Sequence, residues 1–474
     1  MKLLRFAGLG LFAYLFFLAA RVQDAFSARY VIIVGILVWA IAGFLIVRPA
    51  LEASRIRQIL LVILLLGGLA RFFWAIYVPT RPVSDFRSYH KFAVKLAQDE
   101  IPDALSKNPG YPLLLSIGYR IEPAVITGKL LNAALSTLTI FLVFLLGSAV
   151  STPLTGLLAA FLFAILPAEI NMVSVLGAEV AATTLITAAT LTLVYGCQKK
   201  RWIGWVYSGG LLFGIGLTIR SSLAFLAPLL LGILVFIDHS AISQKICRII
   251  AVLAGTATGL LLLAGWHSAL TGRLTLAALQ SQDAFPFLSG TNIEAEGGWN
   301  EEDAALYFSW QASERDRLAI AEAVRRVREN PLGMTLFIPQ KIAVLMGDQT
   351  YGNTWSIYPI NWRNLTILRD QRQEVLDANQ YLNQAVYILL LALAAYHFLD
   401  YRLPAPAISA MAIFSVILLI LPHTILEVQS RYHHIILPYI MLVAGQGLLE
   451  LVERSTRSRI AINQQNLQET GRAA

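Results

Sequence analysis

The chain has 474 residues, of which 57% are hydrophobic and only 14% charged, with a mean hydropathy of +0.64. Soluble domains carry about 25% charged residues and their cores stop growing near about 250–300 residues, so this composition excludes an ordinary soluble protein. The net charge of +8 does not indicate nucleic-acid binding, because Lys and Arg stand mainly in short runs between apolar segments. Two cysteines, Cys197 and Cys247, exclude a disulfide framework and a cysteine metal site.

Apolar stretches of about 20 residues, long enough to cross a bilayer as helices, recur along the chain. They predict an all-α, polytopic membrane protein with about twelve transmembrane helices and short interfacial helices in its loops. The predicted spans are residues 4–20, 30–47, 58–77, 124–147, 154–173, 178–196, 203–219, 222–238, 248–266, 383–399, 404–421 and 435–452. A further apolar run, 332–347, is short and contains Pro339 and Lys341, so we expect an interfacial helix there.

Basic residues between the spans predict the orientation of the chain, because cytoplasmic loops are enriched in Lys and Arg. With the N-terminus in the cytoplasm, the inner loops hold Lys2, Arg5, Arg48, Arg55, Arg57, Lys199, Lys200, Arg201, Lys245, Arg248, Arg402, Arg454, Arg457 and Arg459. Two long segments, 79–123 and 267–382, then lie together on the outer side, with most of the unusual polar residues. A scaffold has no reason to sort its polar groups in this way, whereas an active site at the outer lipid–water boundary does.

Five regions follow from this topology. They are N-terminal membrane helices at 1–57, a transmembrane module at 58–266 that includes the first outer loop 79–123, an outer loop with interfacial helices at 267–382, C-terminal membrane helices at 383–452 and a cytoplasmic tail at 453–474. In the second loop, Asn300 precedes three acidic residues, which predicts a helix N-terminus. Residues 313–330 mix apolar and charged positions up to Pro331, which predicts an amphipathic helix.

Asp85, in the first outer loop, is the principal candidate for a catalytic base. It follows a helix exit and stands beside aromatic residues near the membrane surface, where we expect its carboxylate to be partly desolvated and therefore a better proton acceptor. Asp is also a favoured N-cap residue, so Asp85 can instead cap a helix that begins near Phe86. From this residue alone, capping is the simpler interpretation.

The motif Ser84-Asp85-Phe86-x-x-Tyr89, followed by Pro109-Gly110-Tyr111-Pro112, resembles the first outer loop of the GT-C glycosyltransferases, in the branch of protein O-mannosyltransferases and lipid A aminoarabinose transferases. Further similar pieces follow in the family's order: Gly128 to Ala133, Gly177 to Val180, Leu217 to Arg220 and Ser430 to His433. The chain departs from the family pattern at two places. The family's acidic pair is reduced to Asp85, and Ala178 and Val180 replace the usual Ser and Pro around Glu179.

The resemblance implies transfer of a sugar from a polyprenyl-phosphate donor to an acceptor hydroxyl, with inversion at the anomeric carbon. It implies a multi-pass enzyme of the bacterial inner membrane, with its site on the outer face and a glycan, lipid or protein as acceptor. Asp85 would take the acceptor proton, and Glu179 would support it. Arg220 and Arg431, at outer helix ends, would grip the lipid phosphate, whose negative charge grows in the transition state.

Three more side chains are candidates for substrate binding, each with a structural alternative. Lys129 would add a cation to the site, or its side chain would snorkel to the interface. Tyr89 and Tyr111 would stack on the sugar or the prenyl chain, or belong to an interfacial aromatic belt.

Two further residues have open roles. Glu179 would bind a substrate hydroxyl or pair structurally with Arg220. His433 would bind phosphate, but the adjacent His434 points in another direction on a helix, so we assign no metal ligand. No other spacing demands a metal or cofactor, and dependence on a divalent metal is left open.

The alternatives are a lipid or polysaccharide transporter or flippase, a non-catalytic glycan-assembly subunit, and a polysaccharide polymerase or ligase with a diphosphate-linked donor. A transporter predicts ionisable or broken helices near mid-membrane, often in two matching halves, and we expect neither. The ordered motifs oppose a subunit that only docks, and the short loop with Asp85 favours a monophosphate-linked donor.

Overall fold

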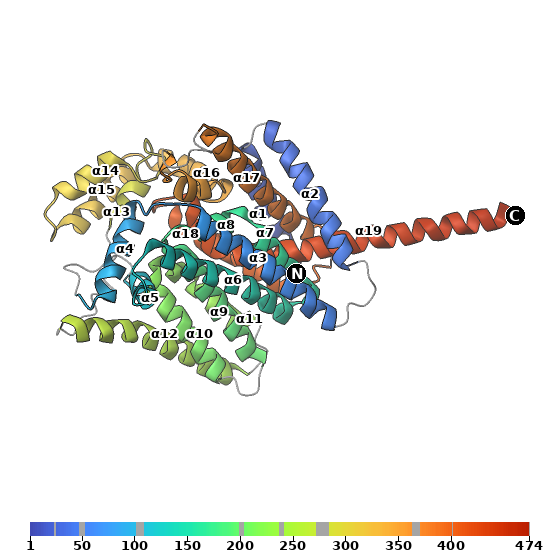
Figure 1. Ribbon diagram of the computed structural model, residues 1–474, viewed down its shortest axis with the longest axis horizontal. Coiled ribbons are helices and arrows are strands. Elements are labelled where there is room, and N and C mark those ends of the chain that lie inside the picture. Colours follow the sequence, from blue (N-terminus) through green and yellow to red (C-terminus); the bar gives the residue numbers. More distant parts are fainter. Residues whose placement is uncertain are drawn as a thin grey trace.

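The computed structural model describes residues 1–22, 25–46, 53–100, 109–198, 203–236, 241–271, 284–362, 370–400 and 402–473. Across these ranges every regular element is a helix and none is a strand, which confirms the all-α prediction. Figure 1 shows a bundle of long helices with a group of short helices at one end. The predicted inner-loop residues Arg48, Lys199, Lys200 and Arg201 lie outside the described residues, as do the side chains of Arg457 and Arg459.

The chain is a multi-pass membrane protein, because many of its described helices are long and apolar. Seven are long and apolar enough to cross a membrane: α1 (Lys2–Arg21), α3 (Ala53–Tyr77), α6 (Val125–Val150), α9 (Ala178–Gln198), α12 (Ile242–Thr271), α18 (Pro406–His423) and the stretch 430–455, formed by η5 (Ser430–Ile436) and the start of α19 (Leu437–Ala473). Shorter apolar stretches lie in α2 (Ala25–Ile46), α7 (Pro153–Ile165), α10 (Ile203–Ile219), η1 (Ser221–Leu226) with α11 (Ala227–Phe236), and α16 (Pro331–Gly347). The expected count of about twelve spans is therefore not confirmed.

Several predicted spans are broken rather than continuous. The predicted span 154–173 ends as α7 at Ile165, Leu166 is extended, and Pro167 opens the short helix α8 (Pro167–Met172). Proline lacks an N–H donor and fits the first position of a helix, so it starts a new helix here rather than continuing the old one. The segments η1 and η5 likewise interrupt the chain at Arg220 and around Arg431 with 3-10 turns.

The stretch 430–455 forms the centre of the bundle. In the most apolar part of this stretch 94% of the residues are buried, against 28% in that of α1. Both α7 and α17 (Arg372–His397) pack along α19. A helix that is apolar on all sides is typical of such a central position.

Glycine brings α10 and α12 into close contact. A Cβ atom added at Gly210 would come within 2.1 Å of the Val252 carbonyl oxygen, and one added at Gly214 within 2.3 Å of the Thr256 carbonyl oxygen. On α12, Gly255 and Gly259 contact the α10 backbone in the same way, so both helices carry glycines four positions apart, the small-residue pattern that lets membrane helices approach closely. This contact fixes the end of α10, where Arg220 follows.

A helical lobe, defined here as residues 284–330, consists of α13 (Phe285–Gly290), α14 (Glu301–Ser309) and α15 (Arg315–Glu329). The Asn300 side chain accepts a hydrogen bond from the Asp303 N–H, which confirms the predicted N-terminus of α14. A small apolar core holds the three helices together, and the Asp303 carboxylate receives the Arg326 guanidinium at 2.7 Å. In Figure 1 the lobe lies at the end of the bundle that also carries α4 and α5.

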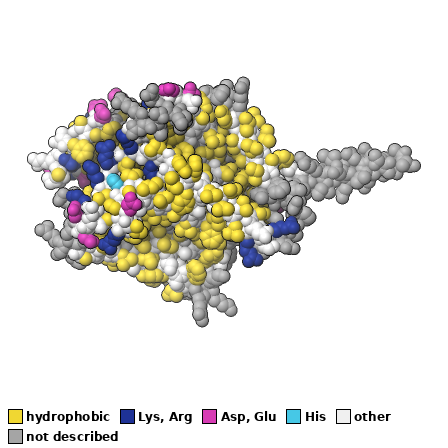
Figure 2. All heavy atoms as spheres, viewed as in Figure 1, with side chains coloured by type: hydrophobic (Ala, Val, Ile, Leu, Met, Phe, Trp, Pro, Cys, Tyr) yellow, Lys and Arg dark blue, Asp and Glu magenta, His cyan; other side chains and the backbone are white. Residues whose placement is uncertain are grey.

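The helices α4 (Ser84–Ala97) and α5 (Gly110–Tyr119) belong to the first long loop. Helix α5 packs on the end of α10, since a Cβ atom at Gly110 would lie 2.3 Å from the Thr218 hydroxyl. On the face drawn in Figure 2, hydrophobic side chains cover the middle of the bundle and many charged ones gather at the end with α4 and the lobe. On this face the charged groups thus gather mainly at that end, with a second group of basic side chains at the opposite end.

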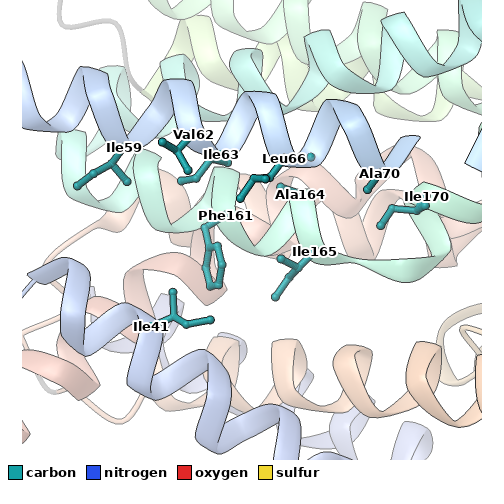
Figure 3. Close-up of a pocket in the computed structure, with 11 residues that line it drawn as sticks. Ile41, Ile59, Val62, Ile63, Leu66, Ala70, Phe161, Ala164, Ile165 and Ile170 are labelled. Carbon is teal, nitrogen blue, oxygen red and sulfur yellow. The ribbon is translucent and has the colours of Figure 1, made fainter. Parts of the chain in front are cut away.

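An apolar cavity of about 370 Å³ opens between α2, α3 and α7 (Figure 3). Its walls are Ile41, Ile59, Val62, Ile63, Leu66, Gly67, Ala70, Phe161, Ala164, Ile165 and Ile170. None of the predicted site residues lines this cavity, so it is separate from the polar cluster described next.

Candidate active site

Glu179 is the centre of a buried charge cluster. It lies in the first turn of α9, where the positive end of the helix favours a carboxylate, and it is only 1% exposed. Its Oε1 atom lies 2.8 Å from the Arg220 guanidinium and 3.4 Å from that of Arg431. The structure therefore brings both predicted arginines onto one carboxylate. Glu179 Oε2 is buried and has no hydrogen-bond partner among the described residues.

Aromatic rings enclose the two guanidinium groups. Arg431 lies over the rings of Trp355 at 4.6 Å and Phe86 at 5.1 Å. The ring of Tyr432 is shared, at 5.2 Å from Arg220 and 5.7 Å from Arg431. Such contacts hold the cations in place and keep water away, which strengthens their action on an anion.

Trp355 was not predicted as part of the site. It comes from η3 (Asn353–Ile357), a π-helical turn, and such turns are often found at functional sites. The neighbouring Ser356 hydroxyl receives the Trp74 indole N–H at 3.1 Å, which anchors the turn to α3. No local sequence pattern marks a π-helical turn, so the sequence offers no signal for this residue.

Asp85 lies in the first turn of α4, beside Phe86, and within electrostatic range of Arg431. Its side chain does not cap the helix: α4 begins at Ser84, with Val83 as N-cap and no side-chain hydrogen bond. The Asp85 side chain is exposed, so the protein itself does not desolvate it. Ser84 has a φ of 49°, a left-handed conformation that costs on the order of 1–3 kcal/mol in a non-glycine residue and is typical of functional sites.

The side chains of the candidates Tyr89, Tyr111 and Lys129 are buried and contact other parts of the protein. Tyr89 and Tyr111 are buried and pack edge to face at 5.6 Å, and the Tyr111 hydroxyl donates to Asn132 at 3.1 Å. Lys129 is buried rather than snorkelling, and its ammonium donates to the Val78 carbonyl at 2.8 Å. Lys129 thus holds the connection that leads into α4 and Asp85.

The two histidines are fully buried. Both ring nitrogens of His433 have protein partners, the Leu345 carbonyl at 2.6 Å and the Gln349 side chain, and its ring stacks on Tyr387. No ring nitrogen of His433 is left for a phosphate. His434 contacts the Thr183 hydroxyl at 2.8 Å and the buried Glu169 carboxylate at 3.1 Å.

Arg71 is a further buried residue that was not predicted. Its side chain is fully buried in α3 and donates to the Phe163 and Ala164 carbonyls, each at 3.0 Å. These carbonyls end α7 and would otherwise lack donors, so Arg71 stabilises the break before Pro167. A basic residue inside a predicted span is unusual, so the sequence did carry a signal for Arg71.

A metal site is not formed among the described residues, where no group of three His, Cys, Asp or Glu side chains could hold an ion. The two guanidinium groups beside Glu179 also repel a cation. The cluster is instead suited to an anion, because two positive charges face a single buried carboxylate.

Known proteins share the fold. Residues 106–267 match the family model described as dolichyl-phosphate-mannose-protein mannosyltransferase. The structure is similar to that of the apo oligosaccharyltransferase of Archaeoglobus fulgidus, with a TM-score of 0.50, 14% identity, and coverage of 87% of this chain and 52% of that one. The oligosaccharyltransferase AglB of the same archaeon, in complex with an inhibitory peptide and a dolichol-phosphate, has the same TM-score and identity over 86% of this chain and 51% of that one.

This chain therefore spans about half the length of those oligosaccharyltransferases. ArnT from Cupriavidus metallidurans bound to undecaprenyl phosphate is similar only at a TM-score of 0.36 and 11% identity, over 84% of this chain and 78% of that one, too low to carry weight. No curated protein sequence matches. The family match over residues 106–267 and the shared fold confirm the predicted resemblance to the GT-C glycosyltransferases. The matched segment contains Glu179 and Arg220, whereas Asp85 and Arg431 lie outside it.

Proposed function

We propose that the protein transfers a sugar from a polyprenyl-phosphate donor to an acceptor hydroxyl, with inversion, at the outer face of a bacterial inner membrane. The observation that carries this proposal is the convergence of Arg220 and Arg431 on the buried Glu179, with Asp85 in electrostatic range. The matched mannosyltransferase family supports a lipid-phosphate donor, as its description names dolichyl phosphate.

The donor phosphate would meet the two guanidinium groups. Two positive charges against one carboxylate leave a net positive charge for the phosphate, and guanidinium forks bind phosphate oxygens in pairs. When the bond between the anomeric carbon and the phosphate oxygen breaks, the phosphate keeps the electron pair. Fixed cations in an aromatic, water-poor surrounding stabilise that growing charge.

The acceptor would approach from the exposed side of α4. Its hydroxyl oxygen forms the new bond to the anomeric carbon from the face opposite the phosphate, which gives inversion, and its proton passes to the Asp85 carboxylate. An exposed Asp85 is open to a large acceptor, whether glycan, lipid or protein. Tyr89, Tyr111 and Lys129 would shape the wall next to this route, and His433, bound to the Leu345 carbonyl, would stabilise η5, which carries Arg431.

The outer-face location rests on charge sorting. Many charged residues gather at the end of the bundle with α4 and the lobe (Figure 2), and the basic residues predicted to be cytoplasmic belong in the sequence to connections that the predicted topology puts on the other side. Cytoplasmic loops are the ones enriched in Lys and Arg, so the polar end would face outwards.

The test is Asp85→Asn in purified protein reconstituted into vesicles with an undecaprenyl-phosphate sugar and an extract of bacterial envelope glycolipids as acceptor. We expect transfer to fall by about 10²–10⁴-fold, the usual contribution of a general base. Asp99→Asn is the matched control, because Asp99 is an exposed carboxylate of the same loop that pairs with Arg120. Transfer by Asp85→Asn at the parent rate would contradict the assignment of the base.

A further inference from the structure

Glu427 stands out among the buried acidic residues because it lies directly behind the arginine cluster. It is 6% exposed and belongs to the segment 426–429 between α18 and η5. Its Oε1 atom accepts hydrogen bonds from the Gln429 amide at 2.6 Å and the Tyr432 hydroxyl at 3.0 Å. Its Oε2 atom accepts one from the Ser289 hydroxyl at 3.3 Å.

Two side-chain routes connect Glu427 to the guanidinium groups. In the first, Gln429 donates to Glu427 and its own carbonyl oxygen accepts from the Arg431 Nε at 2.8 Å. In the second, the hydroxyl of Tyr432 is fixed by Glu427 while its ring faces both Arg220 and Arg431. One carboxylate therefore orients the groups that orient both cations.

The same segment is bound to the helical lobe. The Glu427 N–H donates to the Pro286 carbonyl at 2.8 Å, and the Val428 N–H donates to the Gly297 carbonyl at 2.9 Å. Lys341 of α16 joins the two sides, since its ammonium donates to the Gly290 and Leu426 carbonyls at 2.6 and 2.8 Å. A Cβ atom at Gly290 would lie 2.2 Å from the Leu426 carbonyl carbon, so the contact is very close.

We propose that Glu427 is a positioning residue that sets the geometry of the two-arginine site and couples that site to the helical lobe. This inference rests on the proposed function, because the site it positions is the proposed donor-phosphate site. Its role differs from that of Glu179, which touches the guanidinium groups directly, since Glu427 acts on them through Gln429 and Tyr432.

The charges around Glu427 predict a pH signature. The titratable groups that face it are Arg431 and Tyr432 on η5 and Lys341 on α16. Burial raises the pKa of the Glu427 carboxyl above its ordinary value, and the hydrogen bonds from Tyr432 and Gln429 oppose this only in part. The Glu427 carboxyl group is therefore protonated at a higher pH than a free glutamate. In that pH range its hydrogen bonds with Gln429 and Tyr432 change, and with them the positions of the two arginines.

The experiment measures equilibrium binding of undecaprenyl phosphate to the purified full chain in detergent micelles between pH 4.5 and 8, a range that lies above the ordinary pKa of Glu, about 4.3, because burial raises the pKa of Glu427. We expect Glu427→Gln to weaken binding by about tenfold at pH 8, since small misplacements of positioning groups have large effects. The variant should also lose the part of the acidic change in affinity that comes from Glu427, whereas the part that comes from the lipid phosphate, whose second pKa is about 6, remains in every variant. Gln429→Leu cuts only the first route and should weaken binding without removing the acidic change. Ser289→Ala removes one hydrogen bond to Glu427 and leaves both routes to the arginines and the backbone contacts with the lobe in place, so it is the matched control and should bind within about twofold of the parent.

The outcomes separate this inference from the proposed function. If Arg431→Ala weakens binding and both Glu427→Gln and Gln429→Leu bind like the parent at every pH, Glu427 is not a positioning residue and the donor site stands. If the parent itself does not bind undecaprenyl phosphate, the proposed function fails. If Glu427→Gln does not fold, Gln429→Leu decides alone, because it leaves the Glu427 carboxylate and its lobe contact in place.

Discussion

Replacing Glu179 with Gln would test whether the buried charge cluster is built as the structure indicates. The change keeps the volume of the side chain and removes one negative charge from between two guanidinium groups, 2.8 and 3.4 Å away. No cavity is created, so the effect reports electrostatics rather than packing. The two arginines would then face each other in a buried, aromatic surrounding with no counter-ion in contact.

The expected loss of stability is large because little solvent screens the cluster. Glu179 is 1% exposed, and the side chains of Arg220 and Arg431 are 13% and 10% exposed. Removing one partner of a buried ion pair costs about 3–5 kcal/mol, since the remaining charge stays buried without compensation. We expect Glu179→Gln to lose that amount of unfolding free energy in SDS titrations of the protein in mixed micelles.

A phosphate ligand should restore part of the loss. A ligand at 100 times its Kd stabilises a protein by about 2.7 kcal/mol, and a variant with two uncompensated arginines should bind an anion more tightly than the parent. Undecaprenyl phosphate is therefore expected to stabilise Glu179→Gln more than the parent. The control is Glu122→Gln at an exposed carboxylate, expected within about 0.5 kcal/mol of the parent. A loss below about 1 kcal/mol for Glu179→Gln, or equal stabilisation by the lipid, would refute the reasoning.

Two further substitutions test the supports of the site. Asp303→Asn should destabilise the helical lobe. Burial opposes ionisation of Asp303, but hydrogen bonds from Arg326, Asn300 and Asn292 lower its pKa below the ordinary Asp value. The stability that the ionised carboxylate adds to the lobe is therefore present above the ordinary Asp pKa and is lost as pH falls through the lowered value. Amide hydrogen exchange of α15, corrected for intrinsic rates, should be faster in the variant at pH 7, and faster in the parent only at acidic pH. If the variant exchanges at the parent rate at pH 7, Asp303 does not stabilise the lobe. Gly214→Ala should lower the unfolding free energy by about 1–3 kcal/mol, because the new Cβ atom would lie 2.3 Å from the Thr256 carbonyl oxygen. Gly265→Ala is the control: a Cβ atom there has nothing within 4 Å, so this variant should be neutral or stabilising in the SDS titration used for Glu179→Gln.

The helices could be predicted from sequence far better than their breaks. Hydropathy located nearly every long helix, because an apolar run of that length has few other uses. It could not show that 154–173 divides at Leu166, since the residues on both sides remain apolar and only Pro167 marks the point. The carbonyls that the break leaves open are satisfied by Arg71, a partner from a helix some ninety positions earlier in the chain.

The candidate site was predictable only where a residue type is unusual for its surroundings. Arg220, Arg431 and Glu179 are charges at the ends of apolar helices, and that alone drew attention to them. Trp355 and Glu427 carry no such mark, since an aromatic or acidic residue in a loop is ordinary. Their place beside Arg431 follows from the packing of η3 and the segment 426–429, which depends on contacts between distant parts of the chain.

The enclosed position of α19 has a consequence for biosynthesis. This helix follows in sequence every helix that surrounds it, yet it occupies the middle of the bundle. During translation the earlier helices are inserted with their central place still vacant, and they close only when α19 arrives. Arg431 reaches Glu179 in that same final step, so the charge cluster forms last, and a nascent chain cut short before residue 430 would lack both the central helix and Arg431.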